Sequence, residues 1–335
     1  MKRRQFTSLA GAAALTPFAA FAQHDKLSRV ADGIAASGAD IHSLLVARGA
    51  ATIFERYFPG FDADKLHDTK SVTKSVASLA FGIAVDRGLI GIDDPLAKYF
   101  PDSPDLGLRV SHLLTMSLGL KWVEATPATG DDDNDEARMH RARDPARYVL
   151  SLPVTDPPGQ KFFYNTGALT LLSVLVREAT GRPLDEFAKE VLFEPLGITA
   201  WEWTRYRGDS DAGGGLRLRP RDMMKIGQLV LAGGSWNGRR IVSKAWIDAS
   251  TTPKLEASSG YKYGYLWWLG RSPYNGRELA VIAALGRGGQ SIRIVPGLDL
   301  VVVVTAGYYQ DYSPAAFKVQ RDVFTDVLQA IAAPG

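Results

Sequence analysis

The sequence predicts an α/β (α+β) fold: one antiparallel sheet, flanked by N- and C-terminal helices, with a large and mainly helical domain inserted into it. Short apolar runs at residues 41–58, and four β-rich runs after about residue 260, place the strands at both ends of the chain. The stretch between them, residues 110–250 above all, has mainly helical patterns. The 335 residues, 46% of them hydrophobic, suffice for one large or two modest domains with a real core.

The first 22 residues have the pattern of a secretory signal peptide. Lys2-Arg3-Arg4 is a basic head, residues 9–22 are apolar and rich in alanine, and Ala20-Phe21-Ala22 is a small-x-small cleavage site. Arg3-Arg4-Gln5-Phe6-Thr7 favours the twin-arginine route, with ordinary Sec export as the alternative. We therefore predict a periplasmic or secreted bacterial protein.

The remaining chain divides into two predicted domains. Residues 23–68 and 255–335 would form the sheet domain, and residues 69–254 the mainly helical domain, with the active site at their junction. Residues 41–47 and 51–58 predict a β-hairpin around Arg48-Gly49-Ala50. Residues 71–87 predict a helix that ends at Gly88, and Asp93-Asp94-Pro95 opens a short second helix.

Later elements follow the same logic. Residues 170–179 and 220–231 have strong helical patterns. The expected strands span residues 265–269, 279–285, 291–295 and 298–305, and they are separated by glycine and proline. Ser313-Pro314 would cap a final amphipathic helix.

Composition excludes several classes of function. The chain has 39 Lys and Arg against 36 Asp and Glu, and three of the basic residues lie in the predicted signal, which leaves 36 of each sign. This balance gives no electrostatic reason to expect binding of nucleic acid or anionic lipid, and no later run is apolar enough to span a bilayer. Cysteine is absent, and the five histidines lack the spacing of a zinc site. The acidic run at residues 130–136 lacks the EF-hand pattern and predicts a solvated loop. We therefore expect neither metal nor cofactor.

Ser71-Val72-Thr73-Lys74 sets a hydroxyl and an amine three residues apart at the start of a predicted helix. Because three residues make almost one helical turn, both side chains project from one face. A serine hydroxyl needs a nearby base to attack at neutral pH, and a lysine whose pKa is lowered can be that base. A plain helix N-cap is the alternative for Ser71. Ser259-Gly260-Tyr261-Lys262 repeats the spacing, but its internal glycine predicts a loop.

Two further segments complete a set of motifs. Phe163-Tyr164-Asn165-Thr166-Gly167 precedes a helical segment, and Leu285-Gly286-Arg287-Gly288-Gly289-Gln290 lies between two β runs. With the Ser71 stretch, and in this order, they resemble the active-site signatures of the serine β-lactamase and penicillin-binding-protein superfamily. The resemblance is greatest to its class C-like branch, which includes esterases, D-alanyl-D-alanine carboxypeptidases and 6-aminohexanoate-dimer hydrolases. It covers nearly the whole mature chain.

The resemblance implies a role for each matched residue. Ser71 would be the acylated nucleophile, and Lys74 would accept its proton. Tyr164 would be the second acid/base group, with its pKa lowered by the neighbouring Lys74. The backbone N–H groups of Ser71 and Gln290 would form the oxyanion hole.

Departures from the family pattern bear on the substrate. Thr166 stands where the family has asparagine, and Arg287-Gly288-Gly289 aligns with the Lys-Thr-Gly that recognises a substrate carboxylate. Arg287 keeps the cation and can anchor an anion or point to solvent, whereas Gly288 loses the hydroxyl. Trp122, just after a loop that the resemblance places near the cleft, would wall the acyl pocket or serve as a buried structural residue.

These observations predict an exported serine hydrolase that forms an acyl-enzyme on a small-molecule ester or amide. An esterase or a hydrolase of the 6-aminohexanoate-dimer type fits best, because the altered motifs weaken the β-lactamase and D-alanyl-D-alanine carboxypeptidase alternatives. A catalytically silent ligand-sensing protein on the same fold is the alternative from another class. The sequence does not predict an oligomeric state.

Overall fold

A computed structural model describes residues 17–124, 134–258, 260–311 and 314–332. It contains an eight-stranded antiparallel sheet with the strand order β10-β11-β12-β13-β14-β15-β1-β2. The strands are β1 (Ile41–Arg48), β2 (Ala51–Tyr57), β10 (Leu255–Glu256), β11 (Lys262–Tyr263), β12 (Trp268–Tyr274), β13 (Arg277–Gly286), β14 (Gln290–Val295) and β15 (Leu300–Ala306). The sheet is therefore built from both ends of the chain, as the sequence predicts.

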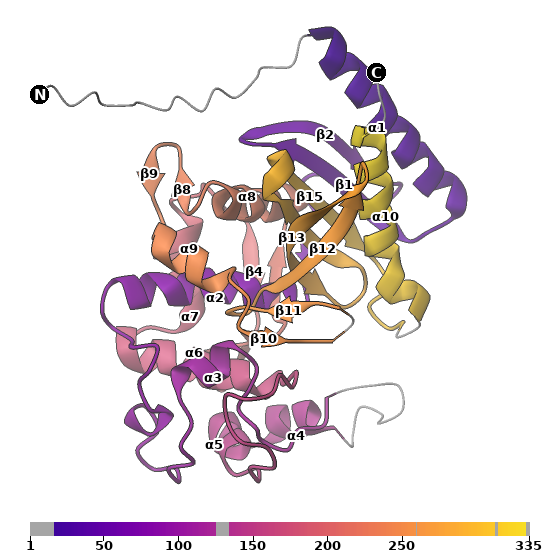
Figure 1. Ribbon diagram of the computed structural model, residues 1–335. Coiled ribbons are helices and arrows are strands. Elements are labelled where there is room, and N and C mark those ends of the chain that lie inside the picture. The colour runs from indigo at the N-terminus through magenta and orange to yellow at the C-terminus, as the bar shows by residue number, and fades with distance from the viewer. Residues whose placement is uncertain (1–16, 125–133, 259, 312–313, 333–335) are drawn as a thin grey trace, which may run out of the picture.

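Both faces of this sheet are covered by helices. Helices α1 (Pro17–Ser37) and α10 (Pro314–Ala332) lie side by side over one face (Figure 1), and α2 (Val72–Asp86) and α8 (Pro220–Leu231) pack on the other. Strand β15 serves both cores, because successive side chains of a strand point to opposite faces. Val301 and Val303 belong to the core beneath α2 and α8, whereas Val302 and Val304 belong to the core beneath α1 and α10.

The chain between β2 and β10 is mainly helical (Figure 1). Besides α2 and α8 it contains α3 (Val110–Leu114), α4 (Asp135–Arg141), α5 (Pro145–Leu150), α6 (Gly167–Thr180), α7 (Leu184–Ala188), α9 (Lys244–Ser250), a 3-10 turn (Leu96–Lys98) and a π-helical turn (Lys189–Phe193). A small sheet joins β3 (His67–Asp68), β7 (Leu216–Leu218) and β4 (Trp201–Trp203), and two hairpins pair β5 (Arg205–Tyr206) with β6 (Asp209–Ser210) and β8 (Ser235–Trp236) with β9 (Arg239–Arg240). The two-domain division stays a prediction, and β3, at its expected boundary, pairs within the helical part.

Most predicted elements are confirmed, with boundaries that shift by a few residues. The hairpin, the helix before Gly88 and the helix Pro220–Leu231 are present, but Asp93-Asp94-Pro95 opens only the single 3-10 turn. The strand predicted at residues 265–269 is wrong at its start, since β12 begins at Trp268. The backbone N–H groups of Tyr265 and Leu266 instead donate to Ser250 and Leu114, because this segment is docked onto the helical part.

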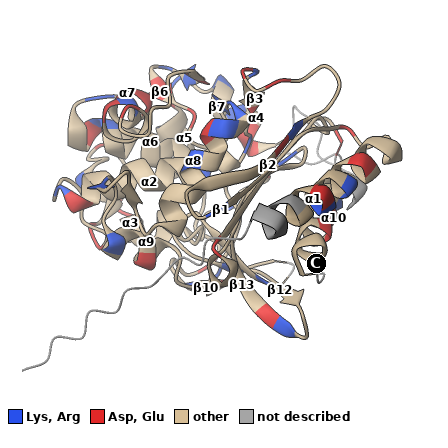
Figure 2. Ribbon diagram, turned by 90° about the horizontal axis from the view of Figure 1, so that it is seen from above, with Lys and Arg blue, Asp and Glu red and all other residues tan. Residues whose placement is uncertain are grey.

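Three predictions concern residues that lie wholly or partly outside the described ranges. They are the signal peptide, of which residues 1–16 are not described, the second Ser-x-x-Lys at Ser259, and the acidic run, whose residues 130–133 are not described. Helix α1 begins at Pro17, inside the predicted signal. Among the described helices, none is both long and apolar enough to cross a membrane. Figure 2 shows Lys and Arg mixed with Asp and Glu over the helices and loops of the described chain.

Candidate active site

A strained turn presents the residue that precedes helix α2. Asp68 ends β3 and accepts a hydrogen bond from the backbone N–H of Lys70 at 3.0 Å, while its carboxylate pairs with the Lys70 ammonium at 2.7 Å. Lys70 adopts φ +48°, a left-handed conformation that is uncommon outside glycine. Thr69 ties the turn to β7, because its hydroxyl donates to the Leu216 carbonyl at 2.8 Å. Such strain is typical of functional sites.

Ser71 follows this turn and does not act as a plain N-cap. Its side chain makes no capping hydrogen bond to the backbone of α2. Its Oγ instead accepts a hydrogen bond from Lys74 Nζ at 3.0 Å. The structure therefore brings together the two residues that the Ser-x-x-Lys spacing predicts on one helical face.

Lys74 is buried, with 2% of its surface exposed. Burial lowers the pKa of its amine, while the carboxylates of Glu124, Glu136 and Asp211 act in the opposite direction. Its Nζ also donates to the Gly213 carbonyl at 2.5 Å. A buried lysine with a lowered pKa spends more time as the neutral amine, which is the form that can accept a proton from a hydroxyl.

The Gly213 carbonyl is held in place by Asp211. One carboxylate oxygen of Asp211 accepts the backbone N–H groups of Gly213 and Gly214 at 2.9 and 3.1 Å. Sequence reasoning missed this contact. An aspartate two residues before a run of glycines is the pattern of an Asx turn, so it could have been found.

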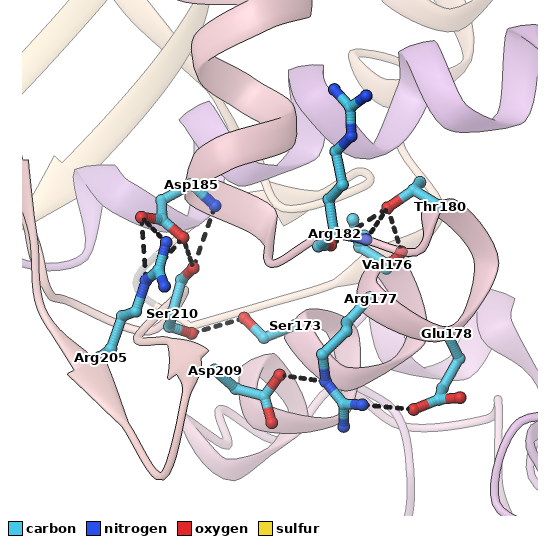
Figure 3. A network of polar contacts seen from close by, with 10 residues as sticks. All are labelled: Ser173, Val176, Arg177, Glu178, Thr180, Arg182, Asp185, Arg205, Asp209 and Ser210. Carbon is cyan, nitrogen blue, oxygen red and sulfur yellow. Dashed lines mark hydrogen bonds and ion pairs between the residues drawn. The ribbon is translucent and has the colours of Figure 1, made fainter.

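A buried polar network anchors the segment that leads into Asp211 (Figure 3). Ser210 donates from its hydroxyl to Asp185 at 2.7 Å, and its carbonyl accepts the Ser173 hydroxyl of α6 at 2.5 Å. Asp185 also forms an ion pair with Arg205 at 2.7 Å. Because buried polar groups that are all satisfied make a rigid support, this network fixes the loop that contacts Lys74.

Tyr164 lies against both members of the pair. Its ring centroid is 5.0 Å from Lys74 Nζ, and it stacks on Trp268 at 6.0 Å between ring centroids. Burial and the charge of Glu124 raise the pKa of Tyr164, against a smaller opposing effect of the Ser71 hydrogen bond. The expectation of a lowered pKa for Tyr164 is therefore wrong, because burial and the neighbouring Glu124 both favour the neutral phenol.

Thr166, at the start of α6, meets Trp122 at a shared carboxylate. Glu124 accepts hydrogen bonds from the Trp122 indole N–H and from the Thr166 hydroxyl, and it accepts the Thr166 backbone N–H at 3.2 Å. Trp122 is only 3% exposed, and its ring packs against the α-carbon of Gly167. These contacts are those of a buried structural residue that supports the start of α6 more than those of a residue that lines an open pocket. The central place of Glu124 was not predicted, since no motif marks it.

The turn between β13 and β14 reaches the nucleophile from the sheet. A Cβ on Gly286 would lie 2.3 Å from the Thr69 carbonyl oxygen, so only glycine lets this strand end approach the Ser71 turn so closely. Gln290 begins β14, and its side-chain amide donates to the carbonyls of Gly288 and Ala306 at 3.1 and 2.5 Å. The Gln290 side chain is thus engaged within the sheet.

Arg287 and Gly288 form this turn. Gly288 has φ +83°, which explains why no threonine-like residue occupies the position. Arg287 is half-buried, and its charge lowers the pKa of both Lys74 and Tyr164, so the guanidinium lies within electrostatic reach of the site. Within the described part of the chain, no group of three or more His, Asp or Glu side chains could hold a metal ion.

Known proteins resemble this chain in sequence and in fold. The family model described as Beta-lactamase matches residues 28–321. The 6-aminohexanoate-dimer hydrolase of Paenarthrobacter ureafaciens is 26% identical over 314 residues, covering 87% of this chain and 79% of that protein. Esterase EstB of Burkholderia gladioli is 29% identical over 148 residues, which span 40% of this chain and 38% of the esterase. The solved structure of EstCE1, a hydrolase with promiscuous acyltransferase activity, superposes with a TM-score of 0.75 at 15% identity, covering 94% of this chain and all of EstCE1 (100%).

Proposed function

This chain belongs to the beta-lactamase family and is a β-lactamase-related serine hydrolase, and we propose that it forms an acyl-enzyme at Ser71 while it hydrolyses an ester or a small amide. The observation that carries the proposal is the 3.0 Å contact between Ser71 Oγ and the buried Lys74 Nζ. A nucleophile and a base within hydrogen-bond reach are the signature of covalent catalysis.

In the acylation step, the neutral amine of Lys74 takes the Ser71 proton while Oγ bonds to the substrate carbonyl carbon. The resulting oxyanion would be stabilised by the backbone N–H groups of Ser71 and Gln290. The close approach of Gly286 to Thr69 supports this pairing, because it sets the start of β14 beside the start of α2. Each such donor is typically worth about 2.7–4 kcal/mol of barrier.

Collapse of the tetrahedral intermediate breaks the bond to the leaving group, which needs a proton. We assign that proton to Tyr164, whose raised pKa keeps the phenol protonated and whose ring lies 5.0 Å from Lys74 Nζ. The Lys74 ammonium then returns a proton to Tyr164, and the proton count balances. In deacylation, water attacks the acyl carbon and its proton follows the reverse path to Ser71.

The substrate assignment rests on the relatives and on the β13–β14 turn. A relative that matches 87% of this chain is named as a 6-aminohexanoate-dimer hydrolase, and another, which matches 40% of it, is named as an esterase. Arg287 supplies a cation at the position where the family places lysine, and Gly288 supplies no hydroxyl. The site therefore fits best a substrate that does not need its carboxylate bound by the threonine of Lys-Thr-Gly, because Gly288 stands at that position.

We further infer that the protein is exported. Support comes from the basic head, the apolar stretch and the Ala20-Phe21-Ala22 cleavage site of the first 22 residues. Expression of the full chain in a bacterial host, followed by sequencing of the mature N-terminus in the periplasmic fraction, tests it. An N-terminus at Gln23 is expected, and an uncleaved cytoplasmic chain would contradict the inference.

The acyl-enzyme proposal is tested with a fluorophosphonate probe and p-nitrophenyl butyrate, beside the Ser71→Ala variant. Wild-type labelling and turnover that both vanish in the variant are expected. Equal behaviour of the two proteins would refute the assignment of Ser71. Nitrocefin and an aminohexanoate dimer, assayed next, rank the β-lactamase alternative against the amide hydrolase.

A further inference from the structure

Glu124 lies between the two sides of the active site and has no role in the mechanism above. Its carboxylate accepts the Trp122 indole N–H and the Thr166 hydroxyl, as well as the Thr166 backbone N–H at 3.2 Å. A buried carboxylate is costly unless it is paired and hydrogen-bonded. The position therefore calls for a charge partner as well as for these donors.

That partner is Lys74, reached through Thr166 and Gly213. A threonine hydroxyl has a single proton, and Thr166 gives it to Glu124. The methyl group of the same side chain lies over Gly213, since a Cβ on Gly213 would meet it at 2.6 Å. The Gly213 carbonyl, in turn, accepts Lys74 Nζ at 2.5 Å. Glu124, Thr166, Gly213 and Lys74 thus form one packed series.

We propose that Glu124 is a positioning carboxylate that stabilises the ammonium form of Lys74, the form that arises when Ser71 loses its proton. This proposal rests on the proposed function of Ser71 and Lys74. Thr166, which stands at the family's asparagine position in the sequence, holds this carboxylate through its hydroxyl and its backbone N–H. The Glu124 carboxylate would therefore act on Lys74 electrostatically, whereas the asparagine of the family would act on it by direct contact.

The protonation of Lys74 depends on the charged groups around it. Glu124 heads the carboxylates that favour the Lys74 ammonium, with Glu136 and Asp211 behind it, and Arg287 opposes them. Burial raises the pKa of Glu124 overall, while Lys74 and the hydrogen bonds from Thr166 and Trp122 favour its carboxylate and Glu136 opposes ionisation. Lys74 is thus the main attractive charge for Glu124, and Glu124 is the main attractive charge for Lys74.

A capping role is the structural alternative. Glu124 also accepts the backbone N–H of Thr166, the residue just before α6, and a carboxylate at a helix N-terminus stabilises the helix. Loss of a cap lowers stability but leaves the pKa of Lys74 in place. The pH dependence of Ser71 reactivity therefore separates the two roles.

The experiment measures the rate of fluorophosphonate labelling of Ser71 against pH for the full chain, for Glu124→Gln and for Glu124→Asp. This probe reports the reactivity of Ser71 without a known substrate. Removal of an opposite charge lowers the pKa of an amine. We therefore expect the acid limb of the pH–rate profile, where the labelling rate falls with falling pH, to shift to lower pH by about one unit or more in Glu124→Gln. A weaker base also lowers the plateau, by about tenfold or more.

Glu124→Asp retains the charge, so its acid limb should stay close to that of the wild type even if its plateau falls. Thermal unfolding of each variant reports the capping contribution separately. If the plateau rate of Glu124→Gln falls while the acid limb of its pH–rate profile stays in place, the inference is overturned but the acyl-enzyme mechanism stays intact. Labelling that persists in Ser71→Ala, or is absent from the wild type, would overturn both.

Discussion

Gly286→Ala is expected to lower kcat/KM by about a hundredfold while the protein stays folded. The added Cβ would lie 2.3 Å from the Thr69 carbonyl oxygen, and ordinary contact begins at 3.4 Å, so β13 and the Ser71 turn must separate by about 1 Å. A misplacement of about 1 Å at a catalytic constellation can cost about 10²-fold in rate, which corresponds to ~2.7 kcal/mol of barrier. The change moves the proposed oxyanion donors apart and leaves Ser71, Lys74 and Tyr164 chemically intact.

The assay is steady-state hydrolysis of p-nitrophenyl butyrate, with thermal unfolding measured in parallel. Overpacking costs about 1–3 kcal/mol of stability, so rates are compared well below the unfolding transition. Gly33→Ala is the matched control, because nothing lies within 4 Å of its Cβ in α1, and it should keep wild-type activity. A folded Gly286→Ala variant that keeps kcat/KM within about threefold of the wild type would refute the link between this approach and the oxyanion hole.

Two further predictions concern Tyr164 and His67. Tyr164→Phe should lose about 10²–10⁴-fold on a p-nitroanilide but much less on a p-nitrophenyl ester, because only the amine leaving group needs the phenol proton. Parallel kinetics on both substrates check this, and equal losses would contradict the donor role. Acidification from about pH 6.5 to 4 should destabilise the fold, because burial lowers the pKa of His67 from 6.5 to about 4, so the unfolded chain binds the proton more readily in that window. The unfolding temperature of the wild type should fall more steeply over this range than that of His67→Gln, and equal slopes would show that His67 is not the cause.

The parts of the fold and site that could be predicted are those encoded locally. The Ser71–Lys74 contact follows from a spacing of three residues on one helix, and no tertiary information is needed to place the two side chains on one face. The strand β15 is predictable for a similar reason, since its run of valines is buried on both faces. Tyr164 and the β13–β14 turn were found only through the order of their motifs.

What could not be predicted depends on contacts between distant segments. Lys74 meets the Gly213 carbonyl across 139 positions, and Thr166 meets Glu124 across 42. Neither glycine nor a lone glutamate gives a periodic signal, so the pattern of the sequence does not mark them. The start of β12 was misplaced for the same reason, because the backbone of Tyr265 and Leu266 is committed to the helical part.

The raised pKa of Tyr164 supports one direction for the proposed proton path. Had Lys74 lowered that pKa, a phenolate could have competed with the amine for the Ser71 proton. Burial acts oppositely on the two groups, since it disfavours the charged form of each: it raises the pKa of Tyr164 and lowers that of Lys74. Burial therefore favours the neutral form of both groups, and of a neutral phenol and a neutral amine the amine is the stronger base. The proposed mechanism therefore uses Lys74 as the base and Tyr164 as the donor to the leaving group, and burial contributes more to this assignment than any single charge does.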